Sequence, residues 1–272
     1  MIKRLLKYIV AITVVSTAII LLFSKKKPEE TFYPRDYEGI IESGVIKAVT
    51  EYNAVSFYVE DGKVCGFDYE LLEAFAKEKG IKMEMTPEMS FEKRLDGVSK
   101  GQFDMIALWT ATTSQLKDSL FFTHPLAIGK QILIQRTDND NYIKSTLDMG
   151  GKTIYAIKNS PAIMRINNLM NEIADSIHVK EIAEYGPEQL LAMVSAGDID
   201  YAVCDEMTAR AYIGKYKNLD MSTNISFNQF YSWGISRKAP ILLDSINSWL
   251  DRYIETKEYK TLYDKYFNRK KH

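Results

Sequence analysis

The chain has 272 residues, of which 46% are hydrophobic and 26% are charged, so it is long enough for one large or two small globular domains. The formal net charge is −1, but residues 1–27 hold six of the 35 basic side chains and no acid, which leaves 29 basic against 36 acidic residues elsewhere. This excess of acid argues against a nucleic-acid partner, which favours a basic face.

Residues 1–27 predict a membrane segment. Basic residues lie on both sides of an apolar run from Tyr8 to Phe23, which is short for a transmembrane helix and long for a signal-peptide core. No cleavage site of A-x-A type ends the run, so we expect an uncleaved signal-anchor, with a cleaved signal peptide as the alternative. Residues 28–36 then predict a polar linker.

Strands and helices alternate along the next part of the chain. We expect strands over residues 44–50, 81–85 and 104–108, a hairpin over residues 57–66 with its turn at Asp61-Gly62, and two helices that end at Gly80 and Gly101. Asp68 is the N-cap candidate of the first helix. The second helix places Phe91, Leu95 and Val98 on one face. Such alternation predicts a mainly parallel α/β sheet.

The second half of the chain repeats the alternation. We expect strands over residues 153–157, 179–183, 200–203 and 231–236, a helix between Gly186-Pro187 and Gly197, a helix over residues 206–216, and two helices within residues 241–267. Ser160-Pro161 is a strong helix start. Its free N–H groups are able to hold an anion, although capping alone also explains the pair.

Cys65 and Cys204 have no metal-type spacing and make no disulfide framework, so we expect two small buried thiols. The histidines His124, His178 and His272 are isolated, and no G-x-S-x-G motif occurs. The sequence therefore predicts no catalytic residue, no metal and no cofactor.

Two motifs carry a resemblance to a known family. The first is G-x-D-Y-E-L, at residues 66–71, and the second is G-x-(I/L)-D-Y-x-(I/V)-x-D, at residues 197–205. In this order they resemble the bacterial extracellular solute-binding proteins of family 3, which are periplasmic, amino-acid-type receptors. The likeness runs from about Val45 to Phe267. It is greatest to the non-catalytic N-terminal module of the membrane-bound lytic murein transglycosylase F group.

The resemblance implies a two-lobed periplasmic-binding-protein fold of type II, in which each lobe is a mainly parallel sheet flanked by helices. One N-terminal membrane segment would precede it. Lobe 1 would comprise residues 37–128 and 230–267, and lobe 2 would comprise residues 129–229. The soluble part would face the extracytoplasmic space from an inner-membrane anchor, or the whole protein would be secreted to the periplasm after cleavage.

The resemblance also implies a ligand site. Ligands of open α/β sheets bind outside the carboxyl ends of the strands, and this favours a site near Trp109, Thr110, Thr112 and Thr113. The family's ammonium-binding aspartate matches Asp205, whose alternative role is to cap the following helix. The remaining candidates are Ser160 and three aromatic residues that would substitute for the family's first-lobe aromatic, where Ala54 stands: Tyr52, Phe57 and Tyr58.

The chain departs from the family at the position of its carboxylate-binding arginine. Leu116 aligns there, Lys117 follows it, and no arginine occurs between Arg94 and Arg136. An arginine fork binds carboxylate in a bidentate, geometrically selective way. We therefore expect standard α-amino acids to bind weakly or not at all, and the sequence does not name the solute.

Taken together, we expect a membrane-tethered protein that closes on a small polar, amino-acid-like or cell-wall-derived solute, for transport or sensing. Its partners would be an ABC-type permease or a cell-wall enzyme. One alternative is a non-catalytic regulatory module of a peptidoglycan system that acts through a protein partner. Another is an enzyme related to lytic transglycosylases. Those enzymes carry their catalytic glutamate in a separate C-terminal domain, which would begin after Phe267, so we expect no enzymatic activity.

Overall fold

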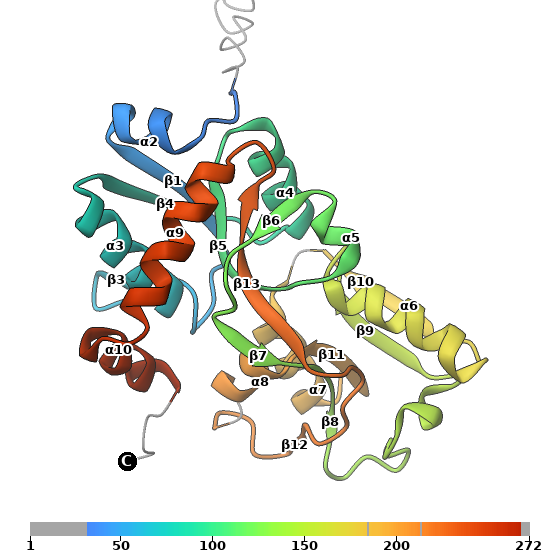
Figure 1. The fold of residues 1–272 in the computed structure, drawn as a ribbon. Coiled ribbons are helices and arrows are strands. Elements are labelled where there is room, and N and C mark those ends of the chain that lie inside the picture. The colour runs from blue at the N-terminus through green and yellow to red at the C-terminus, as the bar shows by residue number, and fades with distance from the viewer. Residues whose placement is uncertain (1–31, 184, 213, 268–272) are drawn as a thin grey trace, which may run out of the picture. The chain divides into compact units, whose positions relative to one another are not determined.

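The computed structural model describes residues 32–183, 185–212 and 214–267, which Figure 1 draws from blue to red. The described residues from Tyr33 onward form one compact unit. Within the described ranges, no helix is both long enough and apolar enough to cross a membrane. The predicted signal-anchor over residues 1–27 and the first part of the predicted linker lie outside these ranges.

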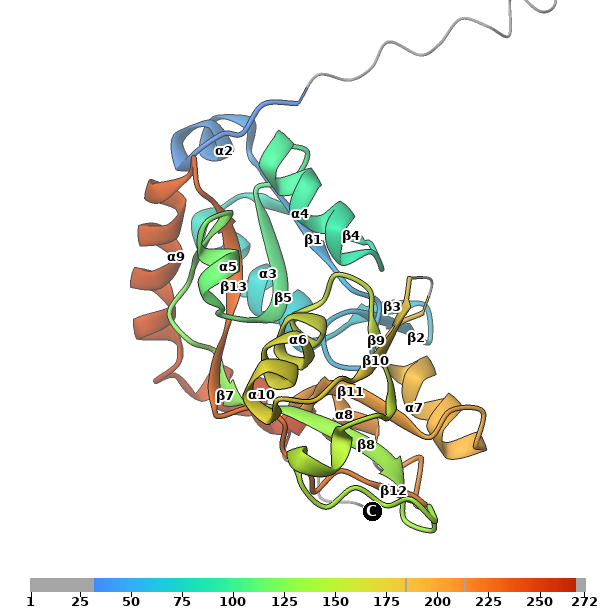
Figure 2. The same ribbon diagram turned by 90° about the vertical axis from the view of Figure 1, so that its right-hand side faces the viewer.

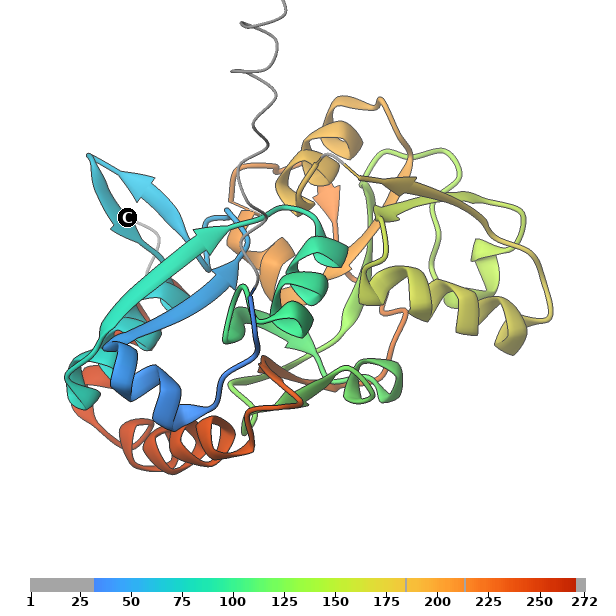
Figure 3. The same cartoon turned by 90° about the horizontal axis from the view of Figure 1, so that it is seen from above.

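The first sheet gathers strands from both ends of the described chain. Its strands follow the order β4-β1-β5-β13-β6, and β7 pairs with the first residues of β13. They are β1 (Val45–Thr50), β4 (Lys82–Pro87), β5 (Met105–Ala111), β6 (Leu120–Phe122), β7 (Ala127–Gly129) and β13 (Gln229–Ser236). Strand β1 is parallel to β4 and β5, and Figure 3 shows β1 and β4 side by side.

The second sheet is built from the middle of the chain, in the order β10-β9-β11-β8-β12. Its strands are β8 (Gln131–Arg136), β9 (Thr153–Ile157), β10 (His178–Ile182), β11 (Tyr201–Asp205) and β12 (Leu219–Asp220). Strand β9 is parallel to β10 and β11. The predicted hairpin is confirmed as β2 (Tyr58–Glu60) and β3 (Lys63–Cys65).

The two large sheets are mixed, which corrects the prediction of mainly parallel sheets. In the first sheet, β13 is antiparallel to β5, β6 and β7. In the second sheet, β8 is antiparallel to β11 and β12. Strands β8 and β13 are those that receive the chain from the other sheet. Alternation of strands and helices in the sequence does not reveal the direction in which such a strand enters its sheet.

Helices cover both faces of each sheet. They are α2 (Tyr37–Ser43), α3 (Phe67–Lys79), α4 (Phe91–Lys100), α5 (Ser114–Lys117), α6 (Pro161–Ile173), α7 (Pro187–Ala196), α8 (Glu206–Tyr212), α9 (Pro240–Tyr253) and α10 (Lys257–Phe267), with the 3-10 helix η1 (Thr146–Met149). The apolar core on one face of the first sheet includes α3, α9 and α10, and that on the other includes α4. Figure 2 shows α6 and α7 on either side of β9.

Most helix ends follow the sequence signals, but the predicted N-cap of α3 does not. Gly80 and Gly101 end α3 and α4 as predicted. Asp68, however, is not the N-cap of α3. Gly66 holds that position, and Asp68 lies inside the first turn, fully buried, where it accepts a hydrogen bond from Trp233 Nε1 at 2.6 Å. The prediction was wrong because a tertiary partner, and not the helix backbone, engages this carboxyl group.

Two chain segments join the sheets. The first passes from β7 through Lys130 to β8, and the second passes from β12 to β13. The predicted lobe limits, at residues 128/129 and 229/230, stay a prediction, because strand pairing alone does not define which residues move as one body.

Candidate functional site

A cavity of about 70 Å³ lies where the two sheets face each other. The first sheet contributes residues that follow β1 and the last residues of β5, and the second contributes the ends of β9 and β11 and the start of β8. The first residues of α4, α6, α7 and α8 complete the wall. The carboxyl ends of parallel strands thus meet at the cavity, as expected for ligand sites in open α/β sheets.

A buried ion pair forms the wall on the side of the first sheet. Arg94, on α4, is 2% exposed, and its Nη2 lies 3.2 Å from Oε2 of Glu51, which follows β1. Its Nη1 donates to the carbonyl oxygens of Glu88 and Met89, at 2.5 and 3.1 Å. Burial lowers the pKa of Arg94, whereas the charge of Glu51 raises it. A guanidinium stays protonated in proteins, so this pair is ionic.

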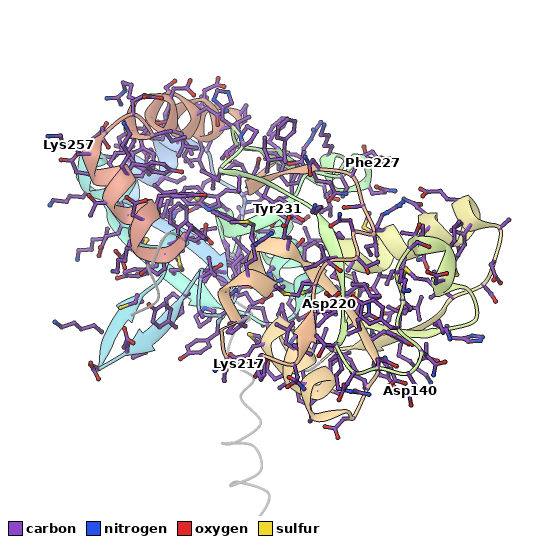
Figure 4. All side chains as sticks on the ribbon, turned by 90° about the horizontal axis from the view of Figure 1, so that it is seen from below. Asp140, Lys217, Asp220, Phe227, Tyr231 and Lys257 are labelled. Atoms are coloured by element: carbon purple, nitrogen blue, oxygen red, sulfur yellow. The ribbon has the colours of Figure 1, made fainter. Side chains whose placement is uncertain are left out.

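Asp205 is the acidic group on the side of the second sheet. Its Oδ1 accepts hydrogen bonds from the Tyr231 hydroxyl at 2.6 Å and from Gln131 Nε2. Neither bond comes from the backbone of α8, so its side chain engages the joining strands β8 and β13 instead of capping that helix. Figure 4 labels Tyr231 where these strands pass between the two sheets.

The ionisation of Asp205 reflects its surroundings. Burial is the main cause that raises its pKa to about 6, the nearby charge of Glu51 contributes to this rise, and the hydrogen bonds from Tyr231 and Gln131 oppose it. Asp205 therefore carries most of a negative charge at neutral pH. Both hydrogen bonds end on Oδ1, and no described residue donates to Oδ2. Oδ2 is thus available as an acceptor.

Four buried polar atoms belong to residues that line this cavity and have no partner among the described residues. They are Arg94 Nε, Trp109 Nε1, Gln131 Oε1 and Ser160 Oγ. Leaving such groups unpaired costs about 1–3 kcal/mol each, so a solute or water that pairs with them gains correspondingly. Ser160 is the N-cap of α6, as predicted, but its side chain makes no capping bond. Its hydroxyl therefore remains free for a solute.

The structure brings together four of the nine site residues predicted from the sequence. Trp109, Thr110, Ser160 and Asp205 line the cavity. The other five do not line it: Tyr52, Phe57, Tyr58, Thr112 and Thr113.

The five residues that do not line the cavity belong to other parts of the fold. Thr113 caps α5 by accepting from the Leu116 N–H at 3.3 Å. Tyr52 and Phe57 form an edge-to-face ring pair, and Tyr58 lies on β2. Thr112 follows β5, and its Oγ1 is buried without a partner among the described residues. Leu116, at the position of the family's arginine, is buried and also outside the lining.

Sequence reasoning missed Glu51, Arg94 and Gln131. A signal for Arg94 was present, because it stands three residues after Phe91 and four before Val98, beside the apolar face of a predicted helix. A charge at such a position is buried only with a partner. That the partner is Glu51 follows from the tertiary fold and not from the spacing.

The two cysteines differ from each other. Cys204 lines the cavity and is buried, as predicted, and burial raises the pKa of its thiol. Cys65 is only partly buried, which corrects the prediction of two buried thiols, because β3 belongs to a two-stranded hairpin and not to a covered sheet. No cluster of three or more metal-ligating side chains occurs among the described residues.

Besides the bond from Tyr231 to Asp205, two further hydrogen bonds link the two sides of the cavity. The Ala54 N–H, after β1, donates to the hydroxyl of Tyr212 on α8 at 2.8 Å. Asn159 Nδ2, after β9, donates to Oε2 of Glu92 on α4 at 2.9 Å. Both bonds join the element set of one sheet to that of the other. The structure therefore represents a closed arrangement.

Two helix-flanked sheets, joined twice and meeting at a polar cavity, define a two-lobed periplasmic-binding-protein fold. The chain belongs to the bacterial extracellular solute-binding proteins, family 3, whose family model matches residues 45–269.

Curated relatives with similar sequences are named membrane-bound lytic murein transglycosylase F. The relative from Photobacterium profundum is 23% identical over 85% of this chain and 45% of its own length. That from Desulfosudis oleivorans is 24% identical over 84% and 50%, respectively. The relative from Alteromonas mediterranea is 25% identical over 86% of this chain and 52% of its own length. The chain thus spans about half the length of these relatives.

Solved structures share the fold. A variant of ArgBP from T. maritima matches with a TM-score of 0.74 and 22% identity, over 85% of this chain and 99% of that one. An ancestral arginine-binding protein bound to arginine matches with a TM-score of 0.72 and 23% identity, over 82% and 98%. An ancestral amino acid-binding protein, a precursor of cyclohexadienyl dehydratase, matches with a TM-score of 0.71 and 23% identity, over 85% and 98%.

Proposed function

We propose that this protein is a non-enzymatic, extracytoplasmic solute receptor, tethered to the inner membrane by residues 1–27, that closes on a small polar solute. The observation that carries the proposal is the set of four unpaired, buried polar atoms of the residues around the cavity. Both sheets supply such atoms, so a solute bound between them would stabilise the closed arrangement relative to an open one.

The proposed contacts are Asp205, Trp109, Thr110 and Ser160, together with Gln131 and the Glu51–Arg94 pair. Asp205 would accept from a donor-rich or cationic group through its unpaired Oδ2. Tyr52, Phe57, Tyr58, Thr112 and Thr113 lie outside the cavity lining and are not part of the proposed site.

The solute is proposed to differ from a standard α-amino acid. Leu116 and Lys117 do not line the cavity, and the Nη atoms of Arg94 are already paired. No described lining residue therefore presents an unoccupied guanidinium fork to an incoming carboxylate. An amino-acid-like or cell-wall-derived compound that does not need a guanidinium fork for its carboxylate fits this cavity better than a standard α-amino acid does.

A second candidate function is a regulatory module that acts on a cell-wall enzyme. It is favoured by the names of the curated relatives, which this chain matches over about half of their length. In that case the closed arrangement would be read by a protein partner instead of an ABC-type permease.

Isothermal titration of a panel of amino acids, amino-acid derivatives and soluble muropeptides tests the proposal. A compound of the panel should bind without turnover, and Asp205→Ala should weaken its binding by about 2–5 kcal/mol, because a charge-assisted contact is lost. Asp198→Ala, at an exposed position of the same lobe, serves as the control and should bind as the wild type does. Unchanged affinity in Asp205→Ala would contradict the assigned site.

Other outcomes separate the rival functions. Cleavage of a muropeptide would contradict the proposed absence of catalysis. Failure of the whole panel to bind, together with co-purification of a cell-wall enzyme, would favour the regulatory module.

A further inference from the structure

The cavity lining carries a net negative charge. Among the described lining residues, the titratable side chains are Glu51, Arg94, Cys204 and Asp205. The thiol of Cys204 is neutral, since burial raises its pKa. Two carboxylates therefore face one guanidinium. Because a buried charge without a partner is costly, the cavity as it stands is complementary to a ligand with one positive charge.

Arg94 is not available to a ligand carboxylate. Its Nη2 is paired with Glu51, and its Nη1 with the carbonyl oxygens of Glu88 and Met89. Glu51 is itself held in place, because its Oε1 accepts from Asn53 Nδ2 at 3.4 Å, and Asn53 Oδ1 accepts from two backbone N–H groups. Only Arg94 Nε remains unpaired, and a single N–H does not form the bidentate fork that selects carboxylates.

The unpaired atoms indicate the other features of the ligand. Asp205 Oδ2, Gln131 Oε1 and Ser160 Oγ are acceptors, and the ammonium group of a ligand is able to donate to them. Trp109 Nε1 and Arg94 Nε are donors, and an amide or hydroxyl oxygen is able to accept from them. The cavity therefore offers an acceptor-rich set with a negative charge and a smaller set of donors.

Building on the proposed function, we propose that the cavity selects a small organic monocation that carries an ammonium group and an uncharged hydrogen-bond acceptor. In this proposal Glu51 is the specificity-determining residue, because it occupies Arg94 and supplies the excess negative charge. A zwitterionic α-amino acid is rejected because its carboxylate meets Glu51 instead of a free guanidinium.

Substitution of Glu51 should change this preference. Glu51→Gln keeps the shape of the side chain and removes its charge, so that the positive charge of Arg94 is no longer neutralised. The lining would then hold one positive and one negative charge, which matches a zwitterion. In the double variant Glu51→Gln/Arg94→Gln, only Asp205 remains charged. The double variant should therefore keep the preference for a monocation, and it avoids an unpaired buried guanidinium.

The test uses L-alaninamide and L-alanine, which differ only in an amide in place of the carboxylate. Calorimetry at pH 7 should show that the wild type binds L-alaninamide at least tenfold more tightly than L-alanine. Glu51→Gln should lower this ratio at least tenfold, the double variant should retain it, and Asp205→Asn should abolish binding of L-alaninamide. Glu60→Gln, at an exposed position on β2, is the control and should leave the ratio unchanged.

The proposal is overturned if the wild type binds L-alanine as tightly as L-alaninamide, if it binds neither compound, or if folded Glu51→Gln keeps the wild-type ratio. Thermal unfolding establishes that each variant is folded. If Glu51→Gln does not fold, the double variant still tests the proposal through its preference for a monocation. The wider panel separates this failure from that of the proposed function. Binding of an anionic or zwitterionic solute would refute only the selectivity, whereas a panel without any binder would refute both.

Discussion

The carboxyl group of Asp68 is buried, and burial is the main cause of its shifted pKa. Its side chain is fully buried, and Oδ1 accepts from Trp233 Nε1. Burial raises its pKa to about 7, while hydrogen bonds from Trp233 and Ser56 oppose the shift. The second oxygen, Oδ2, has no partner among the described residues. The fold therefore favours the neutral, protonated form more strongly than water does.

This predicts a pH dependence of stability. The pKa of Asp68 is about 7 in the native state against 3.8 ordinarily, so between about pH 4 and 7 the native state binds more protons than the unfolded state. Its contribution to stability is therefore present below about pH 4 and lost as the pH rises through 7, by roughly 4 kcal/mol in total. Asp68→Asn should be free of this loss.

Urea unfolding of the wild type and Asp68→Asn from pH 4.5 to 8 measures the effect. The variant should gain stability relative to the wild type as the pH rises. Asp198→Asn, which is exposed, should show no such trend. A constant difference between the wild type and Asp68→Asn across this range would disprove the assigned cause.

The backbone around Gly66 leads to a second prediction, which concerns the stability of the fold. A Cβ at this position would lie 2.2 Å from the carbonyl oxygen of Ser56 and 2.7 Å from the nitrogen of Phe57, and the residue has φ +141°. Both neighbours are backbone atoms, which cannot rotate away. Gly66→Ala should therefore lower the free energy of unfolding by about 4 kcal/mol or more.

Gly62 provides the control for Gly66→Ala. It also has positive φ, at +73°, but an added Cβ would meet no atom within 4 Å. Gly62→Ala should cost only about 1 kcal/mol. Equal unfolding midpoints for the two variants in urea would show that the close approach to Ser56 does not constrain the fold.

At the scale of elements, Phe67 joins α3 to α10. Its ring makes edge-to-face contacts with Trp109 and Phe267, at centroid distances of 5.4 and 5.1 Å, and with three tyrosines of α10. Phe67 is fully buried in the core of the first sheet. Truncation of this ring would therefore leave a cavity between two helices and the sheet.

Phe67→Ala should lower the free energy of unfolding by about 3–5 kcal/mol. Phe227→Ala is the matched control, since Phe227 is 90% exposed, and it should change stability by less than about 0.5 kcal/mol. Chemical denaturation of both variants measures the difference. A loss below about 1 kcal/mol for Phe67→Ala would mean that α10 does not depend on this contact.

Local signals were sufficient to predict most elements, and their failures have a physical cause. The helix starts at Ser160-Pro161 and Gly186-Pro187 are confirmed, because proline in the first turn is a local signal for a helix start. Helix α8 ends at Tyr212 and not near Tyr216, before Gly214 and Lys215 form a turn. The mixed strand directions were missed because pairing depends on contacts distant in the sequence.

At the scale of the whole described fold, the link between Ala54 and Tyr212 holds the two sides of the cavity together. Tyr212 is 4% exposed, and burial raises the pKa of its hydroxyl to about 12. The hydroxyl therefore stays protonated at neutral pH while its oxygen accepts from the Ala54 N–H.

Tyr212→Phe removes one hydrogen bond of the closed arrangement, which is worth about 0.5–1.5 kcal/mol. Solute affinity should fall by about 2- to 13-fold, and the radius of gyration of the unliganded protein should rise in small-angle X-ray scattering. Tyr142→Phe, whose hydroxyl lies 3.5 Å from Ser222 Oγ on the same side of the cavity, should change neither quantity. An unaltered affinity in Tyr212→Phe would show that this bond does not stabilise closure.

The candidate site was predictable only in part. Asp205, Trp109 and Ser160 lie at strand or helix ends, and such ends meet at the cavity in this fold. Glu51 and Arg94 come from different elements and are brought together by packing, so no spacing in the sequence revealed that they pair. The aromatic candidates Tyr52, Phe57 and Tyr58 do not line the cavity, because they belong to the hairpin and the loop before it.

The central claim, that a solute binds between the two sheets, is tested most directly by the three tryptophan indole signals in a ¹H–¹⁵N NMR spectrum. Trp233 Nε1 already donates to Asp68 and Trp249 Nε1 to Glu78, whereas Trp109 Nε1 is buried without a partner among the described residues. Titration with the tightest compound of the panel should shift the Trp109 signal, assigned with Trp109→Phe, and leave the other two nearly unchanged. Saturation of the protein without movement of the Trp109 signal would contradict the account.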